Sequence, residues 1–185
     1  MNRGPRFALR EATAACHDRV DVAFGRFDLS DAADYGRFLR AHARAFLPAE
    51  AALDAAAAET LLPDWPDRRR SGWLKADLAA LGLDAPAPLD APVPATAPAI
   101  WGMLYVLEGS RLGGAMLARS VAAGLPKSYL DSGQPGADWR NFLAALEVAL
   151  ADTVALEAAR QAAEHLFALF ERAARTELES AADDG

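Results

Sequence analysis

The chain has 185 residues, which suits one domain with a sizeable buried core. Acidic residues outnumber basic ones by 26 to 19, and the net charge of −7 argues against a nucleic-acid-binding or membrane-surface protein, because phosphate contacts need clustered Lys and Arg. The single cysteine excludes an intramolecular disulfide and a multi-cysteine metal site. No apolar run approaches the roughly 20 residues of a membrane span, and no apolar signal core follows the first residues, so a soluble cytoplasmic protein is expected.

Abundant alanine and leucine without strand-like alternation predict an all-α bundle of roughly six to eight helices. The first helix is expected over residues 7–25, between Pro5 and a terminal Gly25. The second opens at Ser30, the expected N-cap, and Pro48 should end or kink it. A further helical turn or two should reach residue 61.

Residues 67–81 predict a helix that buries Trp73 and three leucines and carries its arginines, Arg68 to Arg70, on a solvated face. The proline-rich residues 82–98 predict an extended connection within one domain. Residues 127–136 predict a loop carrying Tyr129, and two helices are expected over 137–150 and 153–180. The whole chain, 1–185, should form one domain, with 1–5 and 181–185 as frayed tails.

A helix over residues 99–123 should contain four glycines, each of which costs about 1 kcal/mol relative to alanine. Gly109 and Gly113 are four residues apart and therefore share one face. The bare stripe has two explanations: close helix–helix packing, or a planar ligand lying against the backbone. The glycines from Gly109 to Gly114 also mark a possible bend. The glycines are Gly102, Gly109, Gly113 and Gly114.

Two histidines fall on helical apolar faces. His17 shares a face with Thr13 and Val20, so it is either a hydrogen-bonded core histidine or a metal ligand. For His42, packing beside aromatic neighbours is favoured over metal ligation. The common phosphate-binding, zinc-protease and serine-hydrolase motifs are absent from the sequence.

Two segments in combination resemble the heme oxygenase family. Residues 9–17, Leu-Arg-Glu-Ala-Thr-Ala-Ala-Cys-His, resemble the first helix of that family, where a histidine ligates the heme iron. Residues 105–114, Tyr-Val-Leu-Glu-Gly-Ser-Arg-Leu-Gly-Gly, resemble its distal helix, most closely in the bacterial branch associated with bacteriophytochromes. The pattern of Tyr35, Phe38, Leu39 and His42 is also similar to that branch. The resemblance implies a single-domain helical bundle with heme between the first helix and a kinked, glycine-rich distal helix.

The resemblance also implies the reaction. Heme is both cofactor and substrate, and three successive oxygenations with O₂ open the ring to biliverdin, carbon monoxide and ferrous iron. Electrons come from an external donor such as ferredoxin or a reductase. A bacteriophytochrome could receive the biliverdin.

Each matching residue acquires a role from the resemblance. His17 would be the protein ligand to iron. Gly109 and Gly113 would let the distal helix lie over the heme. Ser110 stands where animal-type members have an aspartate that anchors distal water, so the catalytic role shifts to backbone carbonyls, water and Ser110 itself. The remaining matches are Arg10 and Arg140 for the propionates, Thr13 at a heme edge, Asp21 as an acceptor that orients the imidazole, and Tyr105 and Gly114 as further heme contacts.

Each of these residues also has a purely structural interpretation. Arg10 and Arg140 could be solvated surface arginines, Asp21 a plain helix-surface charge, and Cys16 a small core residue; Phe167 and Phe170 could wall the pocket or belong to the core. Two other functions stay open for the chain. The absence of the aspartate at Ser110 motivates a non-catalytic heme carrier or gas sensor, and a helical interaction domain without heme would use the glycines only for packing.

Overall fold

The computed structural model describes residues 4–132 and 137–183, in which all regular secondary structure is helical, as the composition predicted. The elements are α1 (Pro5–Phe24), α2 (Ala32–Ala55), the 3₁₀ turn η1 (Ala58–Thr60), α3 (Trp65–Arg68), α4 (Ser71–Ala80), α5 (Ala97–Leu117), α6 (Ser128–Asp131), α7 (Ala137–Ala149) and α8 (Thr153–Asp183). At 1.5 Å per residue, α8 alone is roughly 45 Å long.

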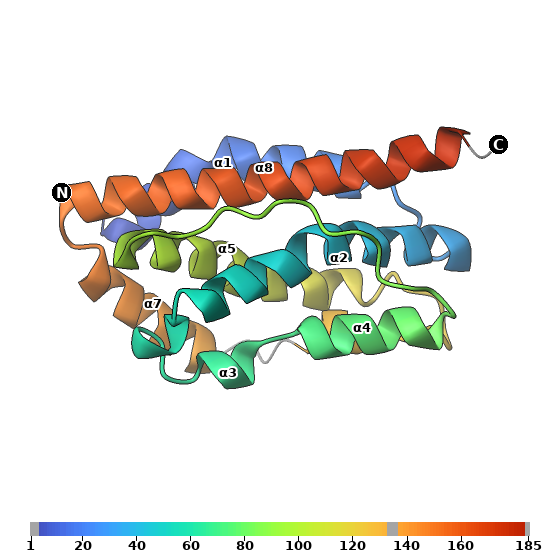
Figure 1. The fold of residues 1–185 in the computed structure, drawn as a ribbon, viewed down its shortest axis with the longest axis horizontal. Helices are drawn as coiled ribbons and strands as arrows, with labels where there is room; N and C mark the ends of the chain where they lie inside the picture. Colours follow the sequence, from blue (N-terminus) through green and yellow to red (C-terminus); the bar gives the residue numbers. More distant parts are fainter. Residues whose placement is uncertain (1–3, 133–136, 184–185) are drawn as a thin grey trace.

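Helix α8 is the element on which the bundle is assembled. Helices α1, α2 and α5 all pack along it, and α4 packs on α2 (Figure 1). α1 and α8 run in the same direction, since Arg19 pairs with Glu171 at 3.1 Å and the His17 ring meets the Phe167 ring. The three long helices around α8 thus place residues far apart in sequence side by side.

Apolar faces of these helices form one continuous core. Its aromatic side chains come from α2, α8 and several other elements, and α5 contributes aliphatic side chains from almost every side of its first three turns. Because α5 is buried so broadly there, its small residues decide how closely neighbours approach. Fully buried members include Tyr35, Phe38, Phe46, Leu53, Leu74, Leu78, Met103, Leu104, Phe142 and Leu166.

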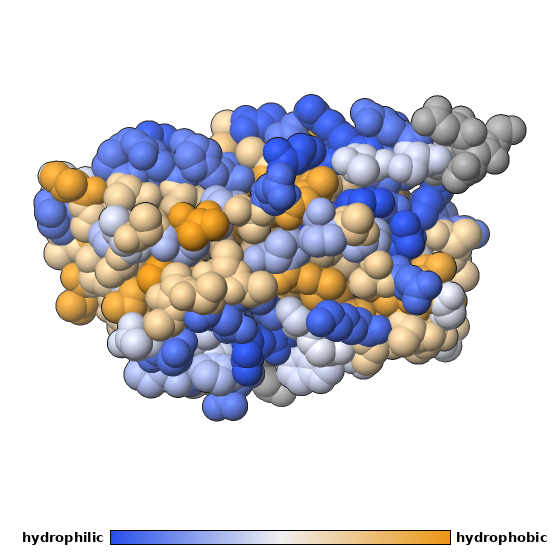
Figure 2. Space-filling model, viewed as in Figure 1, coloured by the Kyte–Doolittle hydropathy of each residue, from blue (hydrophilic) through white to orange (hydrophobic). Residues whose placement is uncertain are grey.

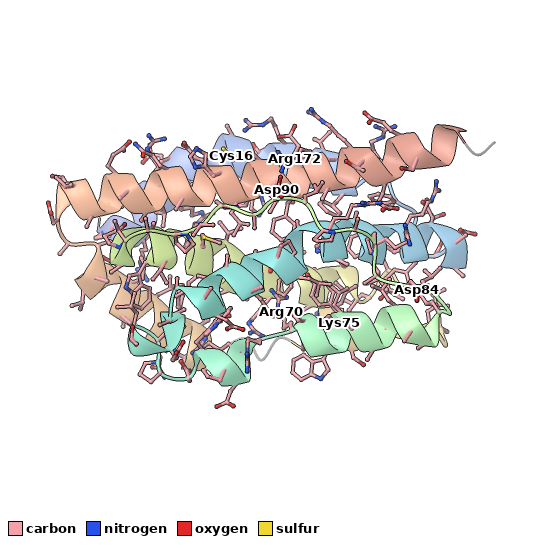
Figure 3. The ribbon with its side chains drawn as sticks, in the orientation of Figure 1. Cys16, Arg70, Lys75, Asp84, Asp90 and Arg172 are labelled. Carbon is pink, nitrogen blue, oxygen red and sulfur yellow. The ribbon has the colours of Figure 1, made fainter. Side chains whose placement is uncertain are left out.

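The extended segment between α4 and α5 crosses the bundle and is held by arginines. Arg44 donates to the Ala87 carbonyl at 3.0 Å, and Arg172 to the Asp90 carbonyl at 3.4 Å (Figure 3). Figure 2 shows apolar side chains along the middle of this face, with hydrophilic helices above and below. No helix in the described residues is long and apolar enough to cross a membrane.

Several predicted boundaries were wrong. α2 continues through Pro48 to Ala55, and Asp31 caps it in place of Ser30 by accepting the Asp34 N–H at 2.8 Å. The predicted helix over 67–81 is two helices interrupted at Arg69 and Arg70. α5 ends at Leu117, short of residue 123, because the chain turns before the positive-φ Gly124.

Other differences concern loops, tails and exposure. The predicted loop 127–136 contains the short helix α6, while residues 133–136 lie outside the described part. Helix begins at Pro5 and continues to residue 183, where tails were expected; residues 1–3 and 184–185 are not described. Trp73 is 44% exposed, because α4 turns only Leu74 and Leu78 inward with Asp77.

Candidate functional site

His17 stands on the outer side of α1 with one ring nitrogen engaged. Its Nδ1 lies 3.1 Å from a carboxylate oxygen of Asp21, one turn further on, and the two side chains are 61% and 66% exposed. The Phe167 ring of α8 meets the imidazole edge-on at 5.9 Å between centroids. The exposure contradicts a core histidine, and the Asp21 contact leaves Nε2 as the nitrogen available to a ligand.

The four glycines of α5 separate into two kinds. A Cβ on Gly102 would come within 2.1 Å of the Ala159 carbonyl oxygen on α8, and one on Gly114 within 3.3 Å of the Leu130 carbonyl oxygen. These two glycines serve close packing. A Cβ on Gly109 would only touch the Trp139 ring at 3.9 Å, and one on Gly113 would meet nothing within 4 Å. Packing therefore does not explain the stripe formed by Gly109 and Gly113.

The contacts that α1 and α5 make with α8 fix the register of the site, through His17 against Phe167 and Gly102 against Ala159. The Tyr105 hydroxyl interacts with the Thr13 side chain and with Arg10; burial, the larger effect, raises the Tyr105 pKa, while these two neighbours oppose the rise. Figure 1 shows that both helices run in the same direction along α8. One helical turn beyond Thr13 and Tyr105 lie His17 and Gly109.

The same register continues for another turn, which brings Asp21 and Gly113 to one level. The packing on α8 agrees: Gly102 touches Ala159, and seven to eight residues later stand Gly109 and Phe167, the latter against His17. The ligand-competent nitrogen of α1 and the bare stripe of α5 are thus at the same height on α8.

A buried polar cluster lies behind Ser110, and the sequence did not predict it. Arg70, labelled in Figure 3, is 2% exposed. Its Nη2 donates to the Leu107 carbonyl at 2.8 Å and to Ser110 Oγ at 2.5 Å. The Ser110 hydroxyl donates to the same carbonyl at 2.6 Å. Burial lowers the pKa of Arg70.

Two aromatic rings lie against the buried Arg70 guanidinium, and a carboxylate accepts from its backbone. Its guanidinium lies 4.6 Å from the Phe46 ring centroid and 5.2 Å from that of Tyr129. Glu50 accepts the Arg70 backbone N–H at 2.7 Å, and burial raises the Glu50 pKa. The prediction of a solvated face for Arg68 to Arg70 was therefore wrong for Arg70, and also for Arg68, which is 8% exposed; only Arg69 is exposed as expected.

A second ion cluster anchors α5 next to Ser110. Arg68, 8% exposed, donates to Glu108 at 2.7 Å, and Glu108 also accepts from Arg111 at 3.0 Å. Arg111 in turn donates to the Arg68 and Ser132 carbonyls. The segment before α4 is therefore attached to residues 107–111 of α5 at several points.

His42 belongs to this interior as a packed histidine. Its Nδ1 is hydrogen-bonded to the Tyr129 hydroxyl at 2.9 Å, and the rings of Phe24 and Phe38 lie 4.4 and 4.5 Å from its own. Burial, with a smaller contribution from Arg70, lowers the His42 pKa to about 3. A neutral ring enclosed by aromatic residues fits the packing role that the sequence favoured.

The remaining predicted residues lie at the margins. Arg10 is exposed on α1 near Tyr105, and Arg140 is exposed on α7 beside Trp139, whose ring borders Gly109. Cys16 is partly buried at the edge of the core, and Arg19 donates to its sulfur at 3.3 Å. Thr13 is buried and donates to the Leu9 carbonyl at 2.8 Å.

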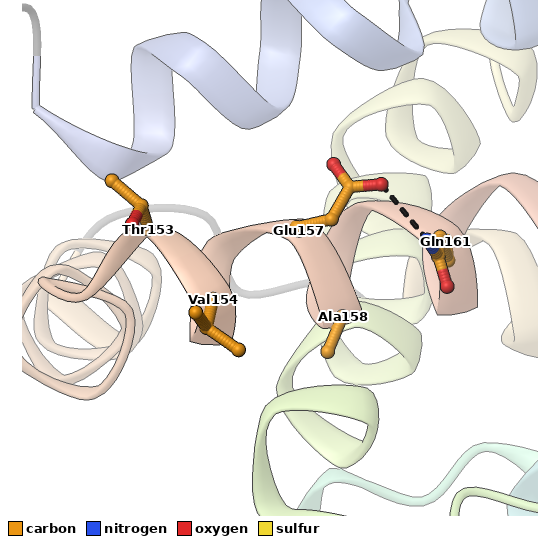
Figure 4. Close-up of a pocket in the computed structure, with 5 residues that line it drawn as sticks. All are labelled: Thr153, Val154, Glu157, Ala158 and Gln161. Atoms are coloured by element: carbon orange, nitrogen blue, oxygen red, sulfur yellow. Dashed lines mark hydrogen bonds between the residues drawn. The ribbon is translucent and has the colours of Figure 1, made fainter.

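A shallow depression on the first turns of α8 is separate from these residues (Figure 4). Most of its lining is exposed, and its polar groups pair locally: Gln161 donates to Glu157 at 2.8 Å, and Arg160 and Gln161 lower the Glu157 pKa to about 2. It shares no residue with the site on α1 and α5.

Sequence reasoning missed Arg70 because its signal is weak. Three consecutive arginines in a predicted helix resemble a surface, and burial of Arg70 depends on a break between α3 and α4 that no proline or glycine marks at that point. Trp65 and Trp73, on either side, were the available indication that the segment lies against the core.

The arrangement of helices defines the class first. The fold matches a heme oxygenase from Neisseria meningitidis, solved with NO and CO bound, with a TM-score of 0.81 and 24% identity over 95% of this chain and 92% of that one. It also matches a heme oxygenase from Leptospira interrogans, with a TM-score of 0.74 and 19% identity over 93% and 98% of the two chains. The chain therefore has the heme oxygenase fold.

Sequence similarity then assigns the family. The chain is 36% identical over 146 residues to a heme oxygenase from Xanthomonas campestris pv. campestris, a match that spans 76% of this chain and 88% of that protein. No family model matches the sequence. At this identity and coverage, the chain belongs to the heme oxygenase family.

Proposed function

We propose that the chain is a heme oxygenase that holds heme between the His17 face of α1 and the Gly109–Gly113 stripe of α5. The register that α1 and α5 share on α8, set by His17 against Phe167 and by Gly102 against Ala159, is the observation that supports the proposal most strongly. It brings the exposed imidazole of His17 to the same level along α8 as Gly109 and Gly113, the two glycines of α5 at which an added Cβ would clash with no neighbour.

The residues of this region are chemically suited to bind heme. A Cβ at Gly113 would enter open space, which is the space that a flat ligand would occupy. Phe167 supplies an apolar contact beside His17. Arg10, near Tyr105, and Arg140, next to Trp139, are both exposed and would pair with the propionates. Among the described residues no three His, Cys, Asp or Glu side chains gather to hold a metal, so His17 would be a single protein ligand to iron brought by the heme.

The roles of the side chains follow from their contacts. His17 would bind iron through Nε2. The Asp21 carboxylate would keep the imidazole proton on Nδ1 of His17 and make Nε2 a stronger ligand. Bound heme supplies the activation of O₂ and is itself opened to biliverdin, carbon monoxide and ferrous iron, with electrons from ferredoxin or a reductase. Gly109 and Gly113 would keep the face opposite His17 free of side chains. Ser110, fixed by Arg70, would order water there.

The wider setting is proposed from the resemblance of residues 105–114. It is that of a bacterial cytoplasmic enzyme whose biliverdin can pass to a bacteriophytochrome. Tyr105 and Thr13 would border the heme edge, whereas Gly114, turned toward Leu130, would contribute by letting α6 approach.

Turnover of the hemin-loaded protein tests the proposal. Given ferredoxin and its reductase under air, the complex should lose its Soret band and release biliverdin. A Soret band that persists, with a stable carbonmonoxy complex, would instead identify a heme carrier or gas sensor. Weak, identical hemin spectra for wild type and His17→Ala would identify a helical domain that does not use heme.

A further inference from the structure

The hydrogen bonds around Ser110 assign its hydroxyl a single polarity. The Ser110 proton is donated to the Leu107 carbonyl at 2.6 Å, and one oxygen lone pair accepts from Arg70 Nη2 at 2.5 Å. A hydroxyl has one proton and two lone pairs. One lone pair is therefore left, and Ser110 can accept a further hydrogen bond but cannot donate one.

Arg70 is the side chain that enforces this arrangement. Its Nη2 carries two hydrogens, and the structure uses them on the Leu107 carbonyl and on Ser110 Oγ. The guanidinium cannot swing away easily, because it lies against both the Phe46 and Tyr129 rings and is almost fully buried. With both the Leu107 carbonyl and the oxygen of Ser110 fixed to one rigid donor, the hydroxyl has no freedom to rotate.

Ser110 itself is only partly buried and lies directly after Gly109. Its remaining lone pair is thus available to water or to a ligand against α5. An ionised carboxylate at the same position would likewise accept and not donate. A free serine hydroxyl, in contrast, could turn and do either.

We propose that Arg70 is a positioning residue that holds Ser110 as an acceptor-only group on the face of α5 used by the heme. This inference rests on the proposed function for its ligand, whereas the Arg70–Ser110 contact does not. Arg70 does not touch the reacting group; it sets which hydrogen-bond partner the distal face offers.

The contact is tested first without heme. Isotope-labelled guanidinium NMR of the heme-free protein should show the Arg70 Nη signal shifted in Ser110→Ala and unchanged in Ser120→Ala, an exposed serine just beyond the same helix. An Arg70 Nη signal that does not shift in Ser110→Ala would overturn the proposal, whether or not hemin binds. This arm needs no substitution of the buried arginine.

The polarity is tested in the hemin complex by the pH midpoint of its alkaline spectral transition. Loss of an acceptor should lower the midpoint by roughly 0.5–1 pH unit, the size of one hydrogen bond, in Ser110→Ala. Ser110→Thr, which keeps the hydroxyl, should restore the wild-type value. Arg70→Lys keeps the positive charge but loses the paired guanidinium donors that fix the Ser110 hydroxyl. It should therefore lower the midpoint only in protein that still has Ser110.

Arg69→Lys, at the exposed neighbour, serves as the matched control and should leave the midpoint unchanged. Equal shifts from Arg70→Lys in the wild-type protein and in the Ser110→Ala variant would refute positioning through Ser110, since charge or general structure would then be the cause. A rise of the midpoint in Ser110→Ala would refute the acceptor polarity. Failure of wild type to bind hemin would defeat the proposed function and leave the NMR test of the contact standing.

Discussion

The four glycines of α5 give opposite predictions for the same substitution. Gly113→Ala places a methyl group where the structure has no atom within 4 Å. Gly102→Ala places it 2.1 Å from the Ala159 carbonyl oxygen, a backbone atom that cannot give way unless α5 and α8 separate. If Gly113 is kept for a ligand and Gly102 for packing, stability and hemin affinity should respond separately.

The magnitudes follow from helix propensity and from the contacts. Alanine is favoured over glycine in a helix by about 1 kcal/mol, so heme-free Gly113→Ala should melt roughly 2–4 °C above wild type. For Gly102→Ala, overpacking of about 1–3 kcal/mol exceeds that gain, and forced separation of two helices lies at the upper end, so its melting point should fall by several degrees.

Hemin affinity should change in the other sense for Gly113→Ala. A methyl group between α5 and a flat ligand costs about 1–3 kcal/mol, which corresponds to a roughly five- to 150-fold loss of affinity. Circular-dichroism melting of the heme-free variants and hemin titration by the Soret band measure the two effects. Gly109→Ala, whose methyl would make an ordinary 3.9 Å contact with Trp139, should behave like Gly113→Ala.

The reasoning fails if Gly113→Ala melts below wild type, since the space beside it would then not be open. It also fails if Gly113→Ala is more stable and binds hemin as tightly as wild type. In that case the stripe would have no ligand to accommodate.

Three further predictions concern side chains outside the stripe. Burial lowers the pKa of His42 to about 3 in the folded protein, whereas the ordinary value of 6.5 applies in the unfolded chain. The unfolded chain therefore takes up the proton first as the pH falls, and the free energy of unfolding should drop between these two pH values. Urea titrations should show a loss of about 2 kcal/mol at pH 5. His42→Phe should flatten this slope and His165→Gln, at an exposed position, should not. Glu177→Gln should cost about 1.5–3 kcal/mol in the same assay, because the buried carboxylate accepts from two partly exposed arginines of α2 at 2.5 and 3.2 Å. Asp21→Asn should preserve hemin binding but lower the iron–imidazole stretching frequency in resonance Raman spectra of the ferrous complex, since His17 loses its charged acceptor; an unchanged frequency would remove Asp21 from this role.

Helix type and order were predictable from sequence because apolar spacing reports burial directly. Boundaries were less so: α2 runs through Pro48, where tertiary packing of Phe46 and Leu53 on both sides outweighs the local penalty. The break between α3 and α4 was missed for the reverse reason. Long-range contacts of Arg68 and Arg70 with α5 set it, and no local residue announces such contacts.

The site divides in the same way. His17, Gly109 and Gly113 stood out because their residue types are costly or unusual where they occur. Whether a glycine packs or leaves space depends on the partner helix, so only the structure could separate Gly102 from Gly113. The polarity of Ser110 depends on Arg70, which lies 40 residues away in sequence and has no spacing pattern that points to it.

Replacement of His17 tests the central claim most directly. Hemin-loaded His17→Ala, assayed under air with ferredoxin and reductase, should form no biliverdin, and added imidazole should restore both the spectrum of the complex and its turnover. Biliverdin formation by His17→Ala at the wild-type rate without imidazole would contradict a heme held through α1.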